Sequence, residues 1–424
     1  MTDDSKNSSL KIVFILFLVF SANGFFSLGP WWHRSGVFNI ADVGNAVLWL
    51  FLPILVAFNK DRQVLWNPVS GLIVFYLLFV FLQIFLAYAN YGQSLFDGLI
   101  GIRHQFFYLS FFVFILLLDS TEIIRKLLDI LAIIAVVLVL LAILNYMGLP
   151  LFYYKWAKGQ GMRAGIVRAY IPGMSLVTFS LIWVFTRWLF EEKNRTHTFL
   201  SFVFLLSALF FRQTRMRILS ASVVITIMLI MRKRWRYLVF FVLLVLISAG
   251  IVQVTMKKNI ITEPFILACE NLTQKSGTWS LRLNQLKVDI REFKYHPWLG
   301  SGLSAIRSVT DKKGTRLQHR MSVLSYKSDL GYTHWMKLYG IVGIVWLMLY
   351  FYFQVIMAVK AQRRLSGEDR ILAVFALSHL GYIMMALLTL NYLMVPSHVI
   401  ILILNAAIIV RLYWNSHYMS VSRL

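Results

Sequence analysis

Long apolar runs are the feature that most constrains this chain. Stretches near twenty residues, the length of helix that crosses the hydrocarbon core of a bilayer, recur about twelve times. Of the 424 residues, 59% are hydrophobic and only 14% are charged, which is far more apolar than a water-soluble domain requires. The sequence therefore predicts an all-α polytopic membrane protein with about twelve transmembrane helices, near residues 10–28, 38–58, 69–90, 98–118, 127–148, 171–190, 198–212, 214–231, 237–255, 335–359, 371–390 and 396–412.

Basic residues in the short predicted loops set the expected orientation. Lys and Arg concentrate in loops on the cytoplasmic side of a membrane, and every second predicted loop carries such a cluster, among them Arg232, Lys233 and Arg234. With the N-terminus inside, an even number of spans returns the C-terminus to the cytoplasm. We expect a multi-pass protein of the bacterial inner (cytoplasmic) membrane with both termini cytoplasmic.

One long polar segment interrupts the apolar sequence. It divides a single integral domain into transmembrane helices one to nine (1–255), a large periplasmic loop (256–334), and helices ten to twelve with a cytoplasmic tail (335–424). The loop holds thirteen Lys and Arg residues against six Asp and Glu residues, although topology does not require positive charge on this side. This excess indicates an anionic partner. Anionic lipid headgroups of the bilayer account for many of the lysines equally well, and nucleic acid is not expected here.

The loop contains a predicted amphipathic helix that ends before Pro297. Its apolar stripe recurs at steps of four and three residues, and its polar residues fall on another face. We expect the stripe to lie along the membrane surface and the polar face to turn toward a cavity. The stripe consists of Trp279, Leu283, Leu286, Ile290 and Phe293, and the polar face of Arg282, Gln285, Asp289 and Glu292.

Arginines at the predicted outer edge of the membrane are candidate ligands for an anion. Arg212, Arg215 and Arg217 fall within six residues, where each buried arginine costs about 2.5–3.5 kcal/mol. No acidic residue is near them in the sequence, and the planar guanidinium group binds phosphate in a bidentate manner. We therefore expect an anion among them. Three further arginines are candidate substrate-binding residues. The alternative is a structural role for Arg103 and interfacial anchoring for Arg163 and Arg168.

No cofactor is expected from the motifs. The sequence has no cluster of His, Cys or carboxylate residues with metal-ligand spacing, no Gly-rich phosphate loop and no nucleotide fingerprint. The lone cysteine, Cys269, cannot form an intrachain disulfide.

Three motifs together resemble the O-antigen polymerase and O-antigen ligase superfamily. The first is QTRMRILSAS at 213–222, with Arg215 shortly before a predicted span. The second is Arg282 followed by H-P-W-L-G-S-G at 296–302, which is similar to the H-P-x-x-G-x-G pattern of the family. The third is SDLGYTHWMKLYGIVGI at 328–344, at the end of the loop.

This resemblance implies a metal-independent glycosyltransferase of the multispan type. Its donor would be an oligosaccharide on undecaprenyl diphosphate, and it would form a glycosidic bond to a glycan acceptor at the periplasmic face. By position, Arg215 and Arg282 would hold the diphosphate and His334 would be the base for the acceptor hydroxyl. Asp329, also placed at the substrate, is the rival for this role.

One departure from the ligase pattern favours a polymerase. Ligases typically have H-N at the end of the loop, whereas Trp335 follows His334 here. The first hypothesis is therefore polymerisation of lipid-linked repeats of O-antigen or exopolysaccharide. The alternatives are an O-antigen ligase that uses lipid A-core as its acceptor, and a lipid-oligosaccharide flippase. The sequence leaves open whether a chain-length regulator takes part.

Overall fold

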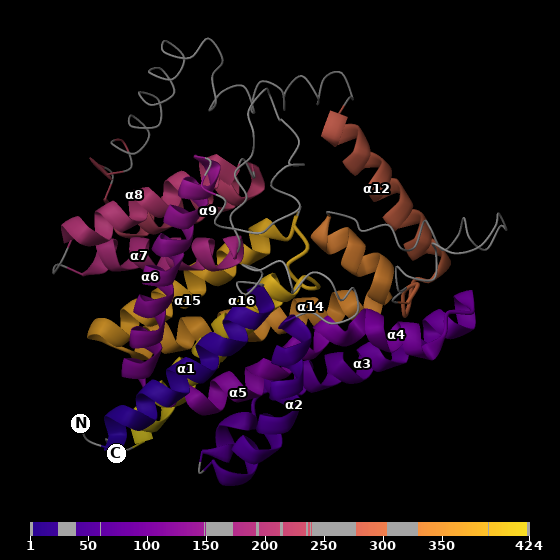
Figure 1. Ribbon diagram of the computed structural model, residues 1–424, viewed down its shortest axis with the longest axis horizontal. Helices are drawn as coiled ribbons and strands as arrows, with labels where there is room; N and C mark the ends of the chain where they lie inside the picture. The colour runs from indigo at the N-terminus through magenta and orange to yellow at the C-terminus, as the bar shows by residue number, and fades with distance from the viewer. Residues whose placement is uncertain are drawn as a thin grey trace.

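The computed structural model is built from helices, as the sequence predicts (Figure 1). It describes residues 3–23, 40–59, 61–147, 149, 173–191, 195–212, 215–234, 236–237, 239, 277–302, 330–388 and 390–421, and no strand occurs among them. The principal helices are α1 (Asp3–Asn23), α2 (Ile40–Phe58), α3 (Pro68–Tyr91), α4 (Leu95–Ile102), α5 (Ser110–Leu117), α6 (Thr121–Tyr146), α7 (Met174–Phe190), α8 (Arg195–Arg212), α9 (Arg215–Met231), α12 (Gly277–Tyr295), α14 (Gly331–Arg364), α15 (Gly367–Ala386) and α16 (Pro396–Val421).

Apolar helices occupy the positions of the predicted spans. Within the described residues, seven helical segments are long and apolar enough to cross a membrane, and four apolar helices are shorter. The fourth predicted span is a broken helix, in which the 3₁₀ segment η3 (Arg103–Leu109) joins α4 to α5. The ninth predicted span, 237–255, lies almost wholly outside the described residues. The tenth helix begins at Gly331, four residues before the predicted boundary.

Helix α16 lies at the centre of the bundle. Its residues from Val399 to Leu412 are all buried, and it packs against α1, α5, α7, α14 and α15. Near its C-terminal end, the buried Arg411 donates to Asp61 at 3.0 Å. Helices α1 and α16 lie side by side (Figure 1).

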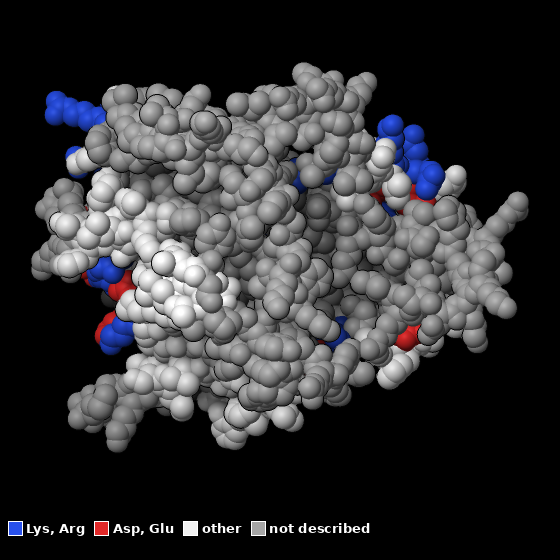
Figure 2. All heavy atoms as spheres, turned by 45° about the horizontal axis from the view of Figure 1, so that its top comes forward, with Lys and Arg blue, Asp and Glu red and all other residues white. Residues whose placement is uncertain are grey.

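Ion pairs join the helix ends at one edge of the bundle. Arg187 lies 2.7 Å from Asp129 and 2.8 Å from Glu191. Arg125 lies 3.0 Å from Glu191 and also pairs with Glu368. These pairs connect α6, α7 and α15. Figure 2 shows basic and acidic side chains next to one another at its left edge. Basic residues that the sequence assigns to cytoplasmic loops thus also hold helices together.

Helix α14 contains a break at Gly340. This residue has φ 62° and ψ −156°, a conformation that is essentially restricted to glycine. In an unbroken helix the N–H groups of Ile341 and Val342 would donate to the carbonyls of Lys337 and Leu338. The break separates these four groups, which a membrane-spanning helix cannot leave without partners.

The H-P-W-L-G-S-G segment supplies partners for all four groups. Ile341 N–H donates to the carbonyl of Pro297 at 2.8 Å, and Val342 N–H donates to that of Trp298 at 3.2 Å. In return, Ser301 N–H donates to the Lys337 carbonyl at 2.9 Å and Gly302 N–H to the Leu338 carbonyl at 3.4 Å. The motif therefore replaces two lost helical hydrogen bonds with four bonds to the loop.

Gly300 of this motif is a glycine because the segment lies very close to the backbone of α14. A Cβ atom on Gly300 would lie 2.1 Å from the carbonyl oxygen of Leu338, so a larger residue would push the segment out of the break. On its other side the segment is held by α3, because Gln83 Nε2 donates to the Leu299 carbonyl at 2.9 Å.

Helix α12 packs on α14 through its polar face. Gln285, Asp289 and Glu292 are buried. Asp289 accepts from the Thr333 hydroxyl at 3.1 Å, and the Nζ atom of the fully buried Lys337 lies 3.7 Å from its other oxygen. The predicted helix is confirmed over Gly277–Tyr295.

The apolar stripe of α12 does not face α14, and its expected position along the membrane surface stays a prediction. Ile290 is 38% exposed, whereas Asp289 is 1% exposed. The charge of Lys337 explains why Asp289 is buried, since a buried ammonium group on α14 requires a carboxylate from the helix that packs on it.

Replacement of Gly340 by alanine should destabilise the protein. The backbone conformation alone costs about 1–3 kcal/mol for a residue with a Cβ atom, and this Cβ would lie 2.5 Å from the Trp298 carbonyl oxygen. The control is Gly71→Ala, because Gly71 lies in α3 with open space around its Cβ position, and the change should stabilise the helix by up to about 1 kcal/mol. Thermal unfolding of the detergent-purified variants measures both effects, and equal unfolding temperatures would contradict the role of the break.

Removal of one member of the Asp289 and Lys337 pair should also destabilise the protein. Lys337→Met leaves a buried carboxylate without its countercharge, at a cost of about 3–5 kcal/mol. Lys337→Met combined with Asp289→Asn should recover part of the loss, because neither charge then remains. A double-mutant cycle on unfolding free energies should give a coupling above about 1 kcal/mol. If the losses of unfolding free energy from the two single substitutions simply add, the pair does not stabilise the packing of α12 on α14.

Candidate functional site

The candidate site lies where the first turns of α9 and α14 border the connection between α15 and α16. The first turn of α14 is fixed to the end of α15: Tyr332 N–H donates to the Leu387 carbonyl at 3.3 Å, and the Tyr332 hydroxyl donates to the Met384 carbonyl at 2.8 Å. His334 lies in this turn and is only 6% exposed. The predicted base is thus part of a firmly packed helix end.

On the other side of the connection lies Arg217, in the first turn of α9. Its Nη2 atom is 2.8 Å from Nε2 of His398, in the first turn of α16. Its guanidinium carbon lies 5.8 Å from the centre of the Tyr392 ring, on which the His398 ring stacks at 4.3 Å. Arg217 is 6% exposed and Tyr392 is fully buried.

The hydrogen bonds determine the protonation of His398. A guanidinium group has only donors, so Nε2 of His398 must accept the bond from Arg217. The ring proton is therefore on Nδ1, which donates to the Asn391 carbonyl at 3.2 Å. This assignment makes His398 neutral, and Arg217 is the cation of the cluster.

One donor atom of Arg217 is left over. Its Nη1 is buried and has no hydrogen-bond partner among the described residues. A buried donor without a partner costs about 1–3 kcal/mol, and more for a charged group. An anion bound at this atom would remove that cost. The N-terminus of α9 adds to the attraction, since its free N–H groups carry partial positive charge.

Arg212 and Arg215 flank this position on the backbone. Helix α8 ends at Arg212 and helix α9 begins at Arg215; the side chains of both residues lie outside the described part of the structure. Their predicted roles stay predictions, as does the convergence of Arg215 and Arg282 on one diphosphate.

Arg282 lies on α12 beyond the beginning of α14. Later residues of α12 meet later residues of α14, since Asp289 contacts Thr333 and Pro297 contacts Ile341, so the two helices run in parallel. Arg282 precedes Asp289 by two turns on the same face, or about 10 Å. The partly buried Arg282 side chain therefore continues the polar face of α12 past the turn that holds His334.

The remaining predicted residues divide into two groups. Arg103 forms an ion pair with Asp42 at 3.2 Å, and its carbonyl accepts from Asn45 at 2.9 Å. These contacts join η3 to α2. Arg163, Arg168 and Asp329 lie outside the described residues, so their predicted contacts with substrate stay untested.

His398 and Tyr392 are site residues that the sequence did not reveal. In the sequence His398 is a lone histidine two residues after Pro396, and its partner Arg217 precedes it by 181 residues. The only local signal was Pro396 itself, which marks the start of a helix and so places His398 in its first turn.

Nothing in the described ranges resembles a bound-metal centre: no three side chains of His, Cys, Asp or Glu gather into a set that could hold an ion. The site instead presents an arginine donor, a helix N-terminus and a nearby histidine. Such groups can bind an anion and place a nitrogen base at the same end of the bundle.

Comparison with known proteins agrees with this description. A family model described as O-antigen ligase matches residues 200–348. The matched segment contains α9, α12 and the first half of α14, and with them Arg215, Arg217, Arg282 and His334. No curated protein matches the chain significantly. Residues 200–348 are thus similar to the O-antigen ligase family, which supports the resemblance to the O-antigen ligase and polymerase superfamily.

Proposed function

We propose that the protein is a membrane glycosyltransferase that polymerises undecaprenyl-diphosphate-linked oligosaccharide repeats at the periplasmic face. The family match and the apolar helices support a membrane enzyme of O-antigen or lipopolysaccharide assembly. We further propose the undecaprenyl-diphosphate-linked donor, the transfer onto a growing polymer and the periplasmic side of the reaction.

The observation that carries the proposal is the buried donor atom of Arg217. Nη1 lacks a hydrogen-bond partner among the described residues, and it lies in the first turn of α9, inside the segment that the family model matches. A diphosphate oxygen suits this atom because it is anionic and accepts several hydrogen bonds. Arg215 and Arg282 would complete the binding of the diphosphate.

The reaction would be a displacement at the anomeric carbon of the donor sugar. The bond from this carbon to the diphosphate oxygen breaks, and its electron pair stays on the diphosphate. The acceptor hydroxyl oxygen forms the new glycosidic bond and passes its proton to His334, with Asp329 as the rival base. Arginines fixed around the leaving group would stabilise its developing charge in a water-poor site, which is the task of a divalent ion in other phosphate chemistry.

The residue after His334 supports a polymerase. Trp335 is 1% exposed, its Nε1–H donates to the Gly343 carbonyl at 2.9 Å, and its ring lies 4.3 Å from that of Tyr339. The position that is Asn in the ligase pattern is thus filled by a core residue. The family match itself fits an O-antigen ligase equally well, so transfer to lipid A-core remains the second candidate.

Purified protein given one defined lipid-linked repeat in EDTA should make polymer on the carrier lipid. This result is expected because guanidinium groups, with no divalent ion, would stabilise the leaving diphosphate. Gel separation of the glycan products measures chain length.

Each other outcome of that assay has a distinct meaning. Product that forms only after lipid A-core is added identifies a ligase. Movement of the lipid-linked repeat across a bilayer without any new glycosidic bond identifies a flippase. Activity that is lost in EDTA and returns with a divalent ion contradicts the metal-independent reaction.

Replacement of Arg215, Arg217 or Arg282 by alanine should nearly abolish polymer formation. Loss of one charged partner of a desolvated phosphate costs about 2–5 kcal/mol, which corresponds to a rate loss of about thirtyfold or more. Lysine should restore little activity, since it keeps the charge but not the two-pronged geometry. Initial rates in the same assay give the comparison.

Arg291→Ala is the matched control on α12. Its side chain is 56% exposed and lies 3.7 Å from Glu292, away from the face that continues to Arg282. Near-normal polymer from Arg282→Ala, or an equal loss from Arg291→Ala, would contradict the assignment.

A further inference from the structure

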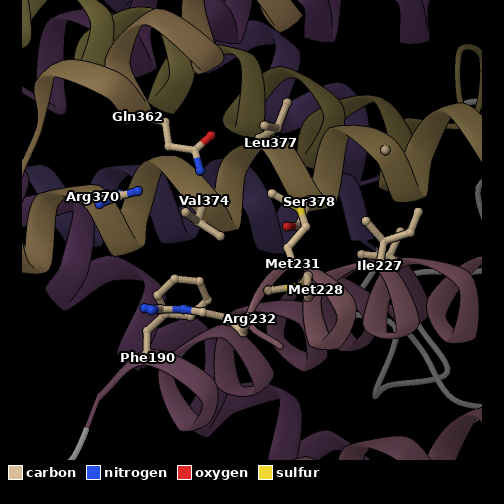
Figure 3. A pocket seen from close by; sticks show the side chains of 12 residues that line it. Phe190, Ile227, Met228, Met231, Arg232, Gln362, Arg370, Val374, Leu377 and Ser378 are labelled. Atoms are coloured by element: carbon tan, nitrogen blue, oxygen red, sulfur yellow. The ribbon is translucent and has the colours of Figure 1, made fainter. Parts of the chain in front are cut away.

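A cavity lies between α9, α14 and α15, at the end of α7 (Figure 3). Its volume is about 390 Å³, within the usual range of ligand pockets. Most of its wall is apolar, and its two arginines are at one end. Figure 3 shows Arg232, Arg370 and Gln362 at the left end, and Ile227, Met228 and Leu377 farther to the right. The cavity therefore has a cationic end and a hydrocarbon end.

The cationic end has no acidic partner among the described residues. Arg232 lies over the Phe190 ring, 3.7 Å from its centre, and neither Arg232 nor Arg370 forms an ion pair within the described part of the chain. Nearby, Arg125 and Arg187 both have carboxylate partners. Burial, and then the charges of Arg370 and Arg234, lower the pKa of Arg232 from its ordinary value. An anion between the two guanidinium groups would reduce their mutual repulsion.

This cavity is separate from the candidate glycosyltransferase site. Arg217 is in the first turn of α9, and Arg232 follows its last residue, Met231. The two arginines are fifteen residues apart, or about 22 Å along a helix, which is roughly three quarters of the thickness of the hydrocarbon core. If the first site faces the periplasm, the cavity opens at the cytoplasmic leaflet. Arg232 belongs to one of the basic clusters that predict that orientation.

We propose that this cavity binds an anionic glycerophospholipid of the cytoplasmic leaflet. The phosphate would lie between Arg232 and Arg370, and an acyl chain would follow the apolar wall toward Ile227 and Leu377. We choose an anionic headgroup by charge complementarity, because two guanidinium groups without an acidic partner in the described part of the chain favour an anionic lipid over a zwitterionic one. The apolar wall suits an acyl chain, which favours a lipid over a small soluble anion.

Native mass spectrometry of the full-length protein in detergent tests the headgroup. The probes are dioleoyl phosphatidylglycerol and dioleoyl phosphatidylcholine. We expect the wild type to bind phosphatidylglycerol preferentially, and Arg232→Gln with Arg370→Gln to bind it at least about tenfold more weakly.

The matched control is Arg236→Gln with Arg363→Gln. Both residues are exposed, lie near the same helix ends and are absent from the cavity wall. An equal loss from this control pair, or unchanged binding by the Arg232 and Arg370 variant, would overturn the proposal.

Gly381→Leu tests the hydrocarbon end with both arginines in place. Gly381 lines the cavity, and a Cβ atom there would meet nothing within 4 Å, so the leucine should fill the space without disturbing the helix. We expect it to weaken binding of dioleoyl phosphatidylglycerol without lowering the unfolding temperature, since leucine is a better helix former than glycine. This variant keeps the proposal testable if the double arginine variant fails to fold.

Two competition measurements separate the sources of the phosphate. Displacement of phosphatidylglycerol by inorganic phosphate at equal concentration would show a simple anion site and overturn the role of the acyl chain. Preferred binding of undecaprenyl phosphate would show that the cavity serves the carrier lipid and would overturn the assignment of the occupant. Retention of phosphatidylglycerol against both competitors is the expected result.

Discussion

The break in α14 is the constraint on which the packing of α12 and the 297–302 segment depends. Gly340 leaves two N–H groups and two carbonyls of a membrane helix without helical partners, and residues 297–302 bind all four. The same segment follows directly on α12, so the position of α12 is fixed from its C-terminal end. The Asp289 and Lys337 pair then fixes its middle. Arg282 and His334 thus belong to one rigid arrangement.

The two ends of α9 show how the protein uses arginine for different purposes. At its first turn, Arg217 is held by His398 and Tyr392 and keeps one donor atom unused. Beyond its last turn, Arg232 stacks on Phe190 and shares a cavity with Arg370. Arginines on other helices, such as Arg187, are neutralised by carboxylates and serve packing. The presence of an acidic partner, more than the presence of arginine, separates packing sites from candidate binding sites.

Much of the fold could be predicted because its signal is local. Spans come from runs of apolar residues, and Pro297 marks the end of α12, two residues beyond Tyr295. The partner of the polar face of α12 could not be predicted in this way. Its carboxylate Asp289 is buried because Lys337, on a different helix, is buried opposite it, and helical periodicity contains no information about that partner.

In the candidate site, too, only the residues with a local sequence signal could be predicted. Arg217 could be singled out from its neighbours in the sequence, whereas His398 depends on a contact across 181 residues. The family motif H-P-W-L-G-S-G was predicted as part of a functional loop. Its hydrogen bonds to the broken helix show a structural task that spacing alone does not reveal.

The position of residues 297–302 before α14 in the chain has a consequence for membrane insertion. A ribosome releases this segment shortly before the helix that it completes, so the partner is already present when Gly340 reaches the bilayer. In the reverse order, four backbone groups would enter hydrocarbon unpaired, at several kcal/mol each. A circular permutant that begins near Gly331 would have to insert α14 with its break unfilled, and the order of the chain thus acts as its own assembly sequence.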